Sequence, residues 1–228
     1  MTELFDSYGK TYGATVQSSI DFSGLQHDFF LRAKADFLRA LIARQLPSMT
    51  KPAILDVGCG VGSLHPFLHD IAGSLNGIDV SEASLAQARV NNPQVNYQIF
   101  DGRFIPYHEA SFDLAIAVCV LHHVAPNQWL EFTREMRRVV RPGGLVCIIE
   151  HNPLNPLTRL AVMRCAFDKD AILLGARQTR RLLVQNGLRE VGVQYFLLLP
   201  STASPARAIE TAVGRLPLGA QYAAWGVA

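Results

Sequence analysis

The sequence has no strong excess of charge of either sign. Its 228 residues include 21 basic and 19 acidic side chains, which leaves a formal net charge of +2. So small a charge does not generate the broad field that attracts nucleic acid or an anionic membrane. The composition therefore disfavours both partners, and 49% hydrophobic with 18% charged residues is typical of a globular chain that buries a full core.

Cysteine is scarce, and its spacing fits neither a disulfide framework nor a metal motif. Cys59, Cys119, Cys147 and Cys165 are far apart and lie among apolar residues, with no Cys-x-x-Cys pair. We interpret them as buried thiols of a reducing compartment.

Long apolar runs are absent as well. No stretch approaches the roughly 18 apolar residues that a membrane-spanning helix needs, and residues 1–6 lack the basic and apolar segments of a secretion signal. We therefore expect a cytoplasmic protein without a membrane span.

The most informative segment that is present runs from Ala53 to Leu64, where four apolar residues and one acid lead into three alternating glycines. This pattern predicts a buried strand, a tight turn and a close approach of the backbone to a ligand. Asp56 stands two residues before the first glycine. A dinucleotide-binding turn would need glycine or alanine where Ser63 stands. The segment therefore favours a nucleoside with a positive or zwitterionic tail over a pyrophosphate.

Strand-like and helix-like segments alternate from residue 52 to residue 150, which predicts a parallel sheet covered by helices. The expected strands are residues 53–57, 74–79, 94–100, 112–119, 145–150, 191–199 and 221–227. The expected helices are residues 28–46, 62–71, 82–90, 126–141, 179–186 and 205–213, with another after Asn155. Ser81 and Asn155 are expected N-caps, and Arg141-Pro142-Gly143-Gly144 is expected to stop a helix.

Further motifs follow the glycine turn in a fixed order. They are Gly77-Ile78-Asp79-Val80-Ser81, Phe100-Asp101-Gly102, Ile105-Pro106 with Ser111-Phe112-Asp113, Leu121-His122-His123-Val124, and Arg138 to Gly144. Over residues 52–150 the chain resembles the class I methyltransferases that use S-adenosylmethionine, in particular the small-molecule branch that contains the quinone-biosynthesis enzymes. The resemblance implies an α/β, Rossmann-like, doubly wound sheet of seven mostly parallel strands in the order 3-2-1-4-5-7-6, with the last strand antiparallel and an N-terminal helical cap.

The resemblance also implies a single methyltransferase domain over residues 1–228. Residues 1–46 would form the cap and a helix, residues 52–150 the donor-binding core, and residues 151–228 the acceptor side and the final strands. Tyr8, Tyr12 and Phe22 would belong to the cap that folds over the donor. We expect a monomer or a homodimer.

The same resemblance assigns the methionine end of the donor to the glycine turn. The Asp56 carboxylate would accept a hydrogen bond from the methionine ammonium. The backbone amides of Gly58, Cys59, Gly60 and Gly62 would face the methionine carboxylate and the ribose.

The nucleoside end would lie against the next two strands. Asp79 would hold both ribose hydroxyls, and Val80 would offer an apolar edge to adenine. Asp101 would accept from the adenine amino group beside the Gly102 amide, although Asp-Gly is also a common turn dipeptide.

Four residues after the fourth and fifth strands are expected near the reacting atoms. Cys119 and His122 would line the floor beneath the sulfonium, although core packing also explains the cysteine. His122, His123 and His151 are candidates for a general base, and His151 could equally be an exposed turn residue. Adjacent histidines are expected to point in different directions without a carboxylate cluster, so we expect no metal.

These observations predict transfer of a methyl group from S-adenosylmethionine, by direct displacement, to an O or N atom of a small-molecule acceptor. The acceptor would be a natural product, a sugar or a lipid-linked metabolite, and S-adenosylhomocysteine would be the product. An RNA-modifying methyltransferase, an NAD(P)-binding oxidoreductase and a catalytically silent donor-binding adaptor stay open as alternatives. The first lacks an Asn/Asp-Pro-Pro-aromatic loop, and the second is disfavoured by Asp56 and Ser63.

Overall fold

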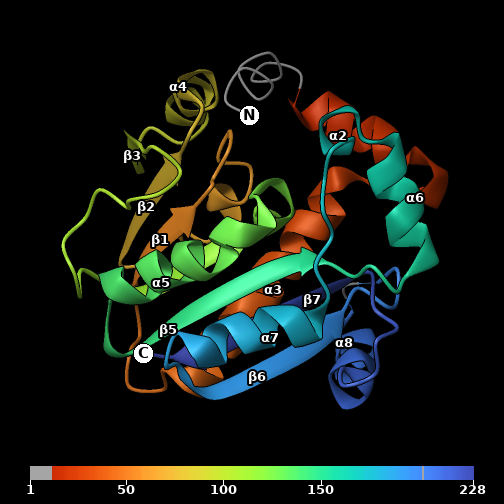
Figure 1. The fold of residues 1–228 in the computed structure, drawn as a ribbon. Helices are drawn as coiled ribbons and strands as arrows, with labels where there is room; N and C mark the ends of the chain where they lie inside the picture. Colours follow the sequence, from red (N-terminus) through yellow and green to blue (C-terminus); the bar gives the residue numbers. More distant parts are fainter. Residues whose placement is uncertain (1–11, 202) are drawn as a thin grey trace.

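The computed structural model describes residues 12–201 and 203–228, and within them seven strands form one sheet in the order β3-β2-β1-β4-β5-β7-β6 (Figure 1). The strands are β1 (Ala53–Val57), β2 (Ser74–Asp79), β3 (Asn96–Ile99), β4 (Phe112–Val118), β5 (Val140–His151), β6 (Arg189–Phe196) and β7 (Gln221–Val227). β7 is antiparallel to both β5 and β6, whereas β1 to β5 pair in parallel. The predicted fold class, strand order and reversed last strand are confirmed.

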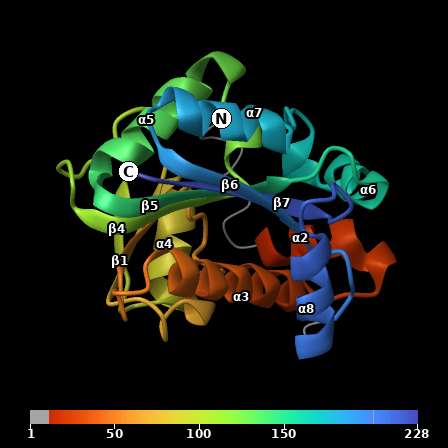
Figure 2. The same cartoon turned by 90° about the horizontal axis from the view of Figure 1, so that it is seen from below.

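Helices cover both faces of this sheet (Figure 2). One face carries α5 (Trp129–Val139) and α7 (Ala176–Gln185), and the other carries α3 (His27–Gln45), α4 (Glu82–Asn91) and α8 (Ser204–Val213). Because the central strands are covered on both sides, β1 and β4 are almost entirely buried, which explains their continuous apolar sequences.

Two further helices lie together at one end of the sheet (Figure 1). α2 (Tyr12–Ile20) contacts α6 (Pro156–Arg164). The expected N-caps are confirmed: Ser81 Oγ accepts from the Ser84 amide at 3.1 Å, and Asn155 Oδ1 accepts from the Thr158 amide at 3.0 Å. Both caps fix helices that begin just beyond the carboxyl ends of strands β2 and β5.

The predicted helix over residues 62–71 is wrong. Only a 3-10 turn forms there, at His65–Phe67. The amides of His65, Phe67 and Leu68 bond to carbonyls three residues back, and Pro66 has no amide to donate.

The expected helix stop at residues 141–144 is also wrong. α5 already ends at Val139, and Arg141 to Gly144 lie inside β5, where its pairing with β4 shifts register. Gly143 and Gly144 instead exchange backbone hydrogen bonds with Ala228, so the two glycines serve the sheet. In the part of the chain that the structure describes, no helix is long and apolar enough to cross a membrane.

Candidate active site

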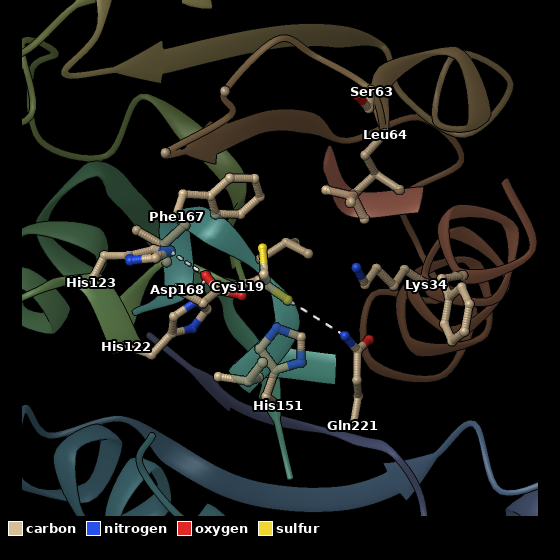
Figure 3. Close-up of a pocket in the computed structure, with 18 of the residues that line it drawn as sticks. Lys34, Ser63, Leu64, Cys119, His122, His123, His151, Phe167, Asp168 and Gln221 are labelled. Atoms are coloured by element: carbon tan, nitrogen blue, oxygen red, sulfur yellow. Dashed lines mark hydrogen bonds and ion pairs between the residues drawn. The ribbon is translucent and has the colours of Figure 1, made fainter. Parts of the chain in front are cut away.

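A cavity of about 980 Å³ lies along the edge where β1, β2, β4 and β5 end. Its walls come from the turns after these strands and from α2, α3 and α6. Figure 3 shows Cys119, His151 and Gln221 on the side of the sheet, with Lys34 of α3 facing them. The volume lies at the upper end of the range for small-molecule sites, so the cavity can hold more than one reactant.

The glycine turn after β1 forms one wall. Gly58, Gly60 and Gly62 have φ of +80°, +54° and +69°, a region that favours glycine. A Cβ atom on Gly58 would lie 2.6 Å from a methyl group of Val120, so the backbone passes very close to the loop after β4. Gly58, Cys59 and Gly60 line the cavity, whereas Gly62 does not.

The hydrogen bonds of this turn differ from expectation. The amides of Gly58 and Cys59 donate to the Ile78 carbonyl at 2.7 and 3.0 Å, and the Gly62 amide donates to Cys59. The expectation that these three amides face a ligand is therefore wrong, because strand β2 and the turn itself already accept from them. The Gly60 amide donates to Asp79 Oδ2 at 2.8 Å.

Asp56, at the end of β1, is held by a histidine that the sequence reasoning missed. His65 Nε2 lies 3.1 Å from Asp56 Oδ2, and His65 Nδ1 lies 2.6 Å from the Tyr97 hydroxyl. The other carboxylate oxygen, Oδ1, is buried and has no hydrogen-bond partner among the described residues. A buried carboxylate oxygen without a donor suits a ligand that brings one.

Asp79 is the last residue of β2, Asp101 follows β3, and both line the cavity. Asp79 accepts from the amides of Gly60 and Ser81, and its burial raises the pKa of the carboxyl. Asp101 is exposed, and hydrogen bonds from the Phe104 and Arg103 amides lower its pKa. Val80 and Gly102 line the space between them.

Cys119 follows β4 in a left-handed conformation, with φ of +58°. Its amide donates to Ile149, and its sulfur accepts from Gln221 Nε2 at 3.5 Å (Figure 3). Burial raises the pKa of the Cys119 thiol, so the group stays protonated and is a poor nucleophile. Cys119 lines the cavity, and its place beneath the sulfonium stays a prediction.

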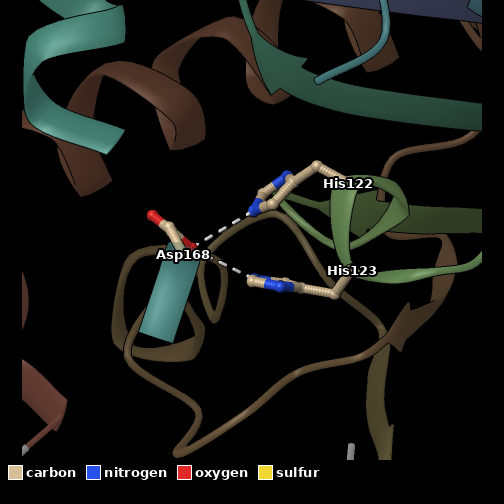
Figure 4. A group of neighbouring side chains, drawn as sticks. All are labelled: His122, His123 and Asp168. Atoms are coloured by element: carbon tan, nitrogen blue, oxygen red, sulfur yellow. Dashed lines mark ion pairs between the residues drawn. The ribbon is translucent and has the colours of Figure 1, made fainter. Parts of the chain in front are cut away.

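His122 and His123 do not point apart, and this prediction is wrong. Their ring centroids are 4.1 Å apart, and both Nε2 atoms face Asp168 Oδ1, at 3.6 and 3.3 Å (Figure 4). The cause is local, because the pair lies in a 3-10 turn at Leu121–His123, and a second turn at Ala166–Asp168 brings the carboxylate to them. The sequence predicted only that residues 151–228, which include Asp168, form the acceptor side.

Glu150, the second residue that sequence reasoning missed, supports His122 from below. It is fully buried; its Oε1 accepts from the Val120 and Leu121 amides, and its Oε2 lies 2.6 Å from His122 Nδ1. Burial works to lower the pKa of His122, but the charges of Glu150 and Asp168 outweigh it and raise that pKa well above its ordinary value. An acid that ends an otherwise apolar strand is the only sequence signal for Glu150.

His151 is half-buried in the cavity wall, not an exposed turn residue. Its ring centroid lies 5.1 Å from that of His122. Burial, together with the positive charge of His122, lowers the pKa of His151 to about 4. The imidazole is therefore neutral at neutral pH and can accept a proton.

Two aromatic residues of the expected cap, Tyr12 and Phe22, lie beside the cavity. Tyr12 stacks on Phe167 with ring centroids 5.2 Å apart, and burial raises the pKa of its hydroxyl. Tyr12 and Phe22 both line the cavity, whereas Tyr8 lies outside the described residues. Lys34, also missed, brings a buried ammonium group into the wall.

The comparisons with known proteins agree with this geometry. A family model described as "Methyltransferase domain" matches residues 55–148. An uncharacterized methyltransferase of Synechocystis is 31% identical over 45% of this chain and 49% of its own length. The ubiquinone biosynthesis O-methyltransferase of Hydrogenovibrio crunogenus is 31% identical over 50% of this chain and 48% of its own. The chain thus spans about half the length of the curated relatives that it matches.

A solved structure matches over the whole chain. It is a SAM-dependent methyltransferase of Thermotoga maritima, described as a possible histamine N-methyltransferase, with a TM-score of 0.73, 18% identity and coverage of 100% of this chain and 99% of that one. At this identity the likeness establishes the fold. Residues 55–148 therefore match a methyltransferase domain, and the chain as a whole has the fold of a solved SAM-dependent methyltransferase.

Proposed function

We propose that this protein transfers a methyl group from S-adenosylmethionine to an oxygen or nitrogen atom of a small-molecule acceptor. One observation carries the proposal: a single cavity is lined both by motif residues at the ends of β1, β2 and β3 and by neutral His151 with the His122–His123–Asp168 cluster. Donor and acceptor can therefore lie in contact within one enclosed space, which is the main requirement of a direct displacement.

The residues present fit the donor. The unpartnered Asp56 Oδ1 suits the donor ammonium, and each oxygen of Asp79 accepts one backbone amide, which leaves lone pairs for the ribose hydroxyls. Lys34 has no acidic partner within residues 12–201 and 203–228, and its charge suits the donor carboxylate. Val80 and Gly102 would border the adenine.

The remaining wall suits a mainly apolar acceptor. It includes Phe22, Leu157, Ala161 and residues 197–200, so the cap and residues 151–228 would shape the acceptor side of one domain. The ubiquinone biosynthesis relative is an O-methyltransferase, and the Thermotoga neighbour is described as a possible N-methyltransferase, so both acceptor atoms occur among similar proteins.

The chemistry divides between the donor and the chain. The sulfonium of the bound donor supplies an electrophilic methyl group. The chain's own part is to align the acceptor, exclude water and, for a hydroxyl acceptor, take its proton on the neutral imidazole of His151.

Calorimetry with S-adenosylmethionine and S-adenosylhomocysteine tests the donor, and no binding of either would refute the proposal. A screen of hydroxyl and amine acceptors with methyl-labelled donor then tests transfer. His151→Asn should lower turnover of a hydroxyl acceptor about 100-fold or more while S-adenosylhomocysteine binding is unchanged. His108→Asn, at an exposed histidine outside the cavity, is the matched control.

A further inference from the structure

The His122–His123–Asp168 cluster has the composition and spacing of a metal site. The Nε2 atoms of the two histidines and a carboxylate oxygen of Asp168 all lie within 4.8 Å of one another (Figure 4). Asp168 Oδ1 is 3.6 Å from His122 Nε2 and 3.3 Å from His123 Nε2. Bonds of about 2.0–2.2 Å to a tetrahedral ion place its ligand atoms about 3.3–3.6 Å apart. The distances from Asp168 Oδ1 to the two histidine nitrogens are therefore in the range expected for ligands of one ion.

The state of Asp168 is a second, independent sign of a missing ligand. The side chain is only 7% exposed, and its Oδ1 makes no hydrogen bond with any residue that the structure describes. The two histidine nitrogens are close enough to count as ion-pair partners but do not reach hydrogen-bond geometry. With no ion bound, the oxygen faces two histidine nitrogens without a hydrogen bond, and a shared metal ion would satisfy it.

Glu150 provides the support that metal-binding histidines usually have. It lies 2.6 Å from His122 Nδ1, so that nitrogen is the one that donates to the carboxylate, and Nε2 is directed toward Asp168. A carboxylate behind a ligating histidine fixes the ring and the tautomer. Glu150 is itself fixed by two backbone amides, so the arrangement is rigid.

We propose that His122 Nε2, His123 Nε2 and Asp168 Oδ1 bind a divalent transition-metal ion of the zinc type. Two imidazoles and one carboxylate suit Zn²⁺, Co²⁺ or Fe²⁺ better than Mg²⁺ or Ca²⁺, which prefer oxygen ligands alone. All three residues line the cavity, so a fourth coordination position opens toward the acceptor end.

The role of the ion rests on the proposed function, whereas its binding does not. An ion in this place would bind the oxygen of a hydroxyl acceptor and lower the pKa of that hydroxyl. The hydroxyl proton passes to His151, the oxygen forms a bond to the methyl carbon, and the carbon–sulfur bond breaks with its electron pair going to sulfur. The site therefore points to an acceptor with a hydroxyl group, such as a phenol or an enol.

Titration of the chelator-treated protein with Co²⁺ and with Zn²⁺ tests the site. Co²⁺ should give a one-to-one visible absorption spectrum that Zn²⁺ abolishes. Asp168→Asn should weaken binding of both ions about 100-fold or more, and His123→Gln should do the same if the first variant folds poorly. Asp170→Asn removes the same charge from an exposed position two residues away and should bind both ions as the unaltered protein does.

The outcomes separate the metal site from methyl transfer. Equal Co²⁺ binding by Asp168→Asn and Asp170→Asn, or no stoichiometric binding by the unaltered protein, would overturn the proposal. S-adenosylhomocysteine calorimetry on the same chelator-treated protein reports donor binding separately. Failure of the donor to bind therefore refutes the methyltransferase proposal and leaves the metal result standing.

Discussion

His65 Nε2 lies 3.1 Å from one carboxylate oxygen of Asp56, whereas the other oxygen of Asp56 is buried without a partner among the described residues. The Tyr97 hydroxyl, 2.6 Å from His65 Nδ1, holds the ring in place. Asp56 is therefore fixed on one side and available on the other. This arrangement prepares the carboxylate for a cationic group before any ligand arrives, which reduces the entropic cost of binding.

The first prediction concerns that available oxygen. Asp56→Asn should weaken S-adenosylhomocysteine binding by about 1.5–3 kcal/mol, on the order of 10- to 100-fold, because a charge-assisted hydrogen bond to the ammonium is lost. Calorimetry measures the change. 5′-Methylthioadenosine has no ammonium group, so its affinity should be the same for both proteins. An equal loss for both ligands would show that Asp56 does not contact the amino-acid tail.

The second prediction is that a change at Asp79 weakens the binding of both ligands, in contrast to the change at Asp56. Asp79→Asn removes the charge that we assign to the ribose hydroxyls, so S-adenosylhomocysteine and 5′-methylthioadenosine should both weaken by about 1–3 kcal/mol. Asparagine keeps a single oxygen, so only one of the Gly60 and Ser81 amides retains its acceptor, and the turn loses one hydrogen bond. Unchanged affinity in a folded variant would contradict the ribose assignment.

The positions of the strands and of the glycine turn could be predicted from sequence because these features are local. A short apolar run predicts a buried strand, and the carboxyl ends of parallel strands must meet at one edge. Asp56, Asp79 and Asp101 lie at or just after the ends of β1, β2 and β3 for this reason, and their donor-binding roles stay predictions. The antiparallel strand and the strand order came from the resemblance.

The acceptor end could not be predicted, because its contacts join distant segments. Asp168 meets His122 across 46 positions of sequence, and nothing in either segment specifies the other. The contact of His65 with Asp56 was missed because a helix was predicted over residues 62–71, where the structure has a 3-10 turn that contains Pro66. The positions of Asp168 and His65 both depend on contacts between segments that are distant in the sequence.

The third prediction is a pH dependence of stability from His27. Burial, and then the charge of Lys34, lowers the pKa of His27 from its ordinary 6.5 to about 4. The unfolded chain therefore takes up a proton as the pH falls below 6.5, whereas the folded chain does not. The stabilising contribution is complete above pH 6.5 and is lost as the pH falls toward 4.

His27→Gln should remove the His27 share of this dependence and leave the share of His151, whose pKa is also lowered to about 4. Urea unfolding of the unaltered protein at a series of pH values should show a loss on the order of 2 kcal/mol across that window, and the variant should show correspondingly less. His108→Gln, at an exposed position, should retain the full dependence. If the free energy of unfolding changes with pH in the same way for His27→Gln and for the unaltered protein, His27 does not cause the pH dependence.

The last prediction separates two costs of replacing a glycine. Gly58 and Gly143 have nearly equal φ, +80° and +83°, but a Cβ on Gly58 would lie 2.6 Å from Val120, whereas none of the described atoms lies within 4 Å of a Cβ on Gly143. Gly143→Ala should therefore destabilise the protein only by the cost of a left-handed backbone conformation for alanine, about 1–2 kcal/mol. Gly58→Ala should cost about 1–3 kcal/mol more than this, because the new methyl group would be overpacked against Val120. Urea unfolding measures both free energies, and Gly58→Ala combined with Val120→Ala should recover part of the added loss. Equal costs for the two glycines would mean that the turn can move away from Val120, and the close approach would then not be what requires glycine at position 58.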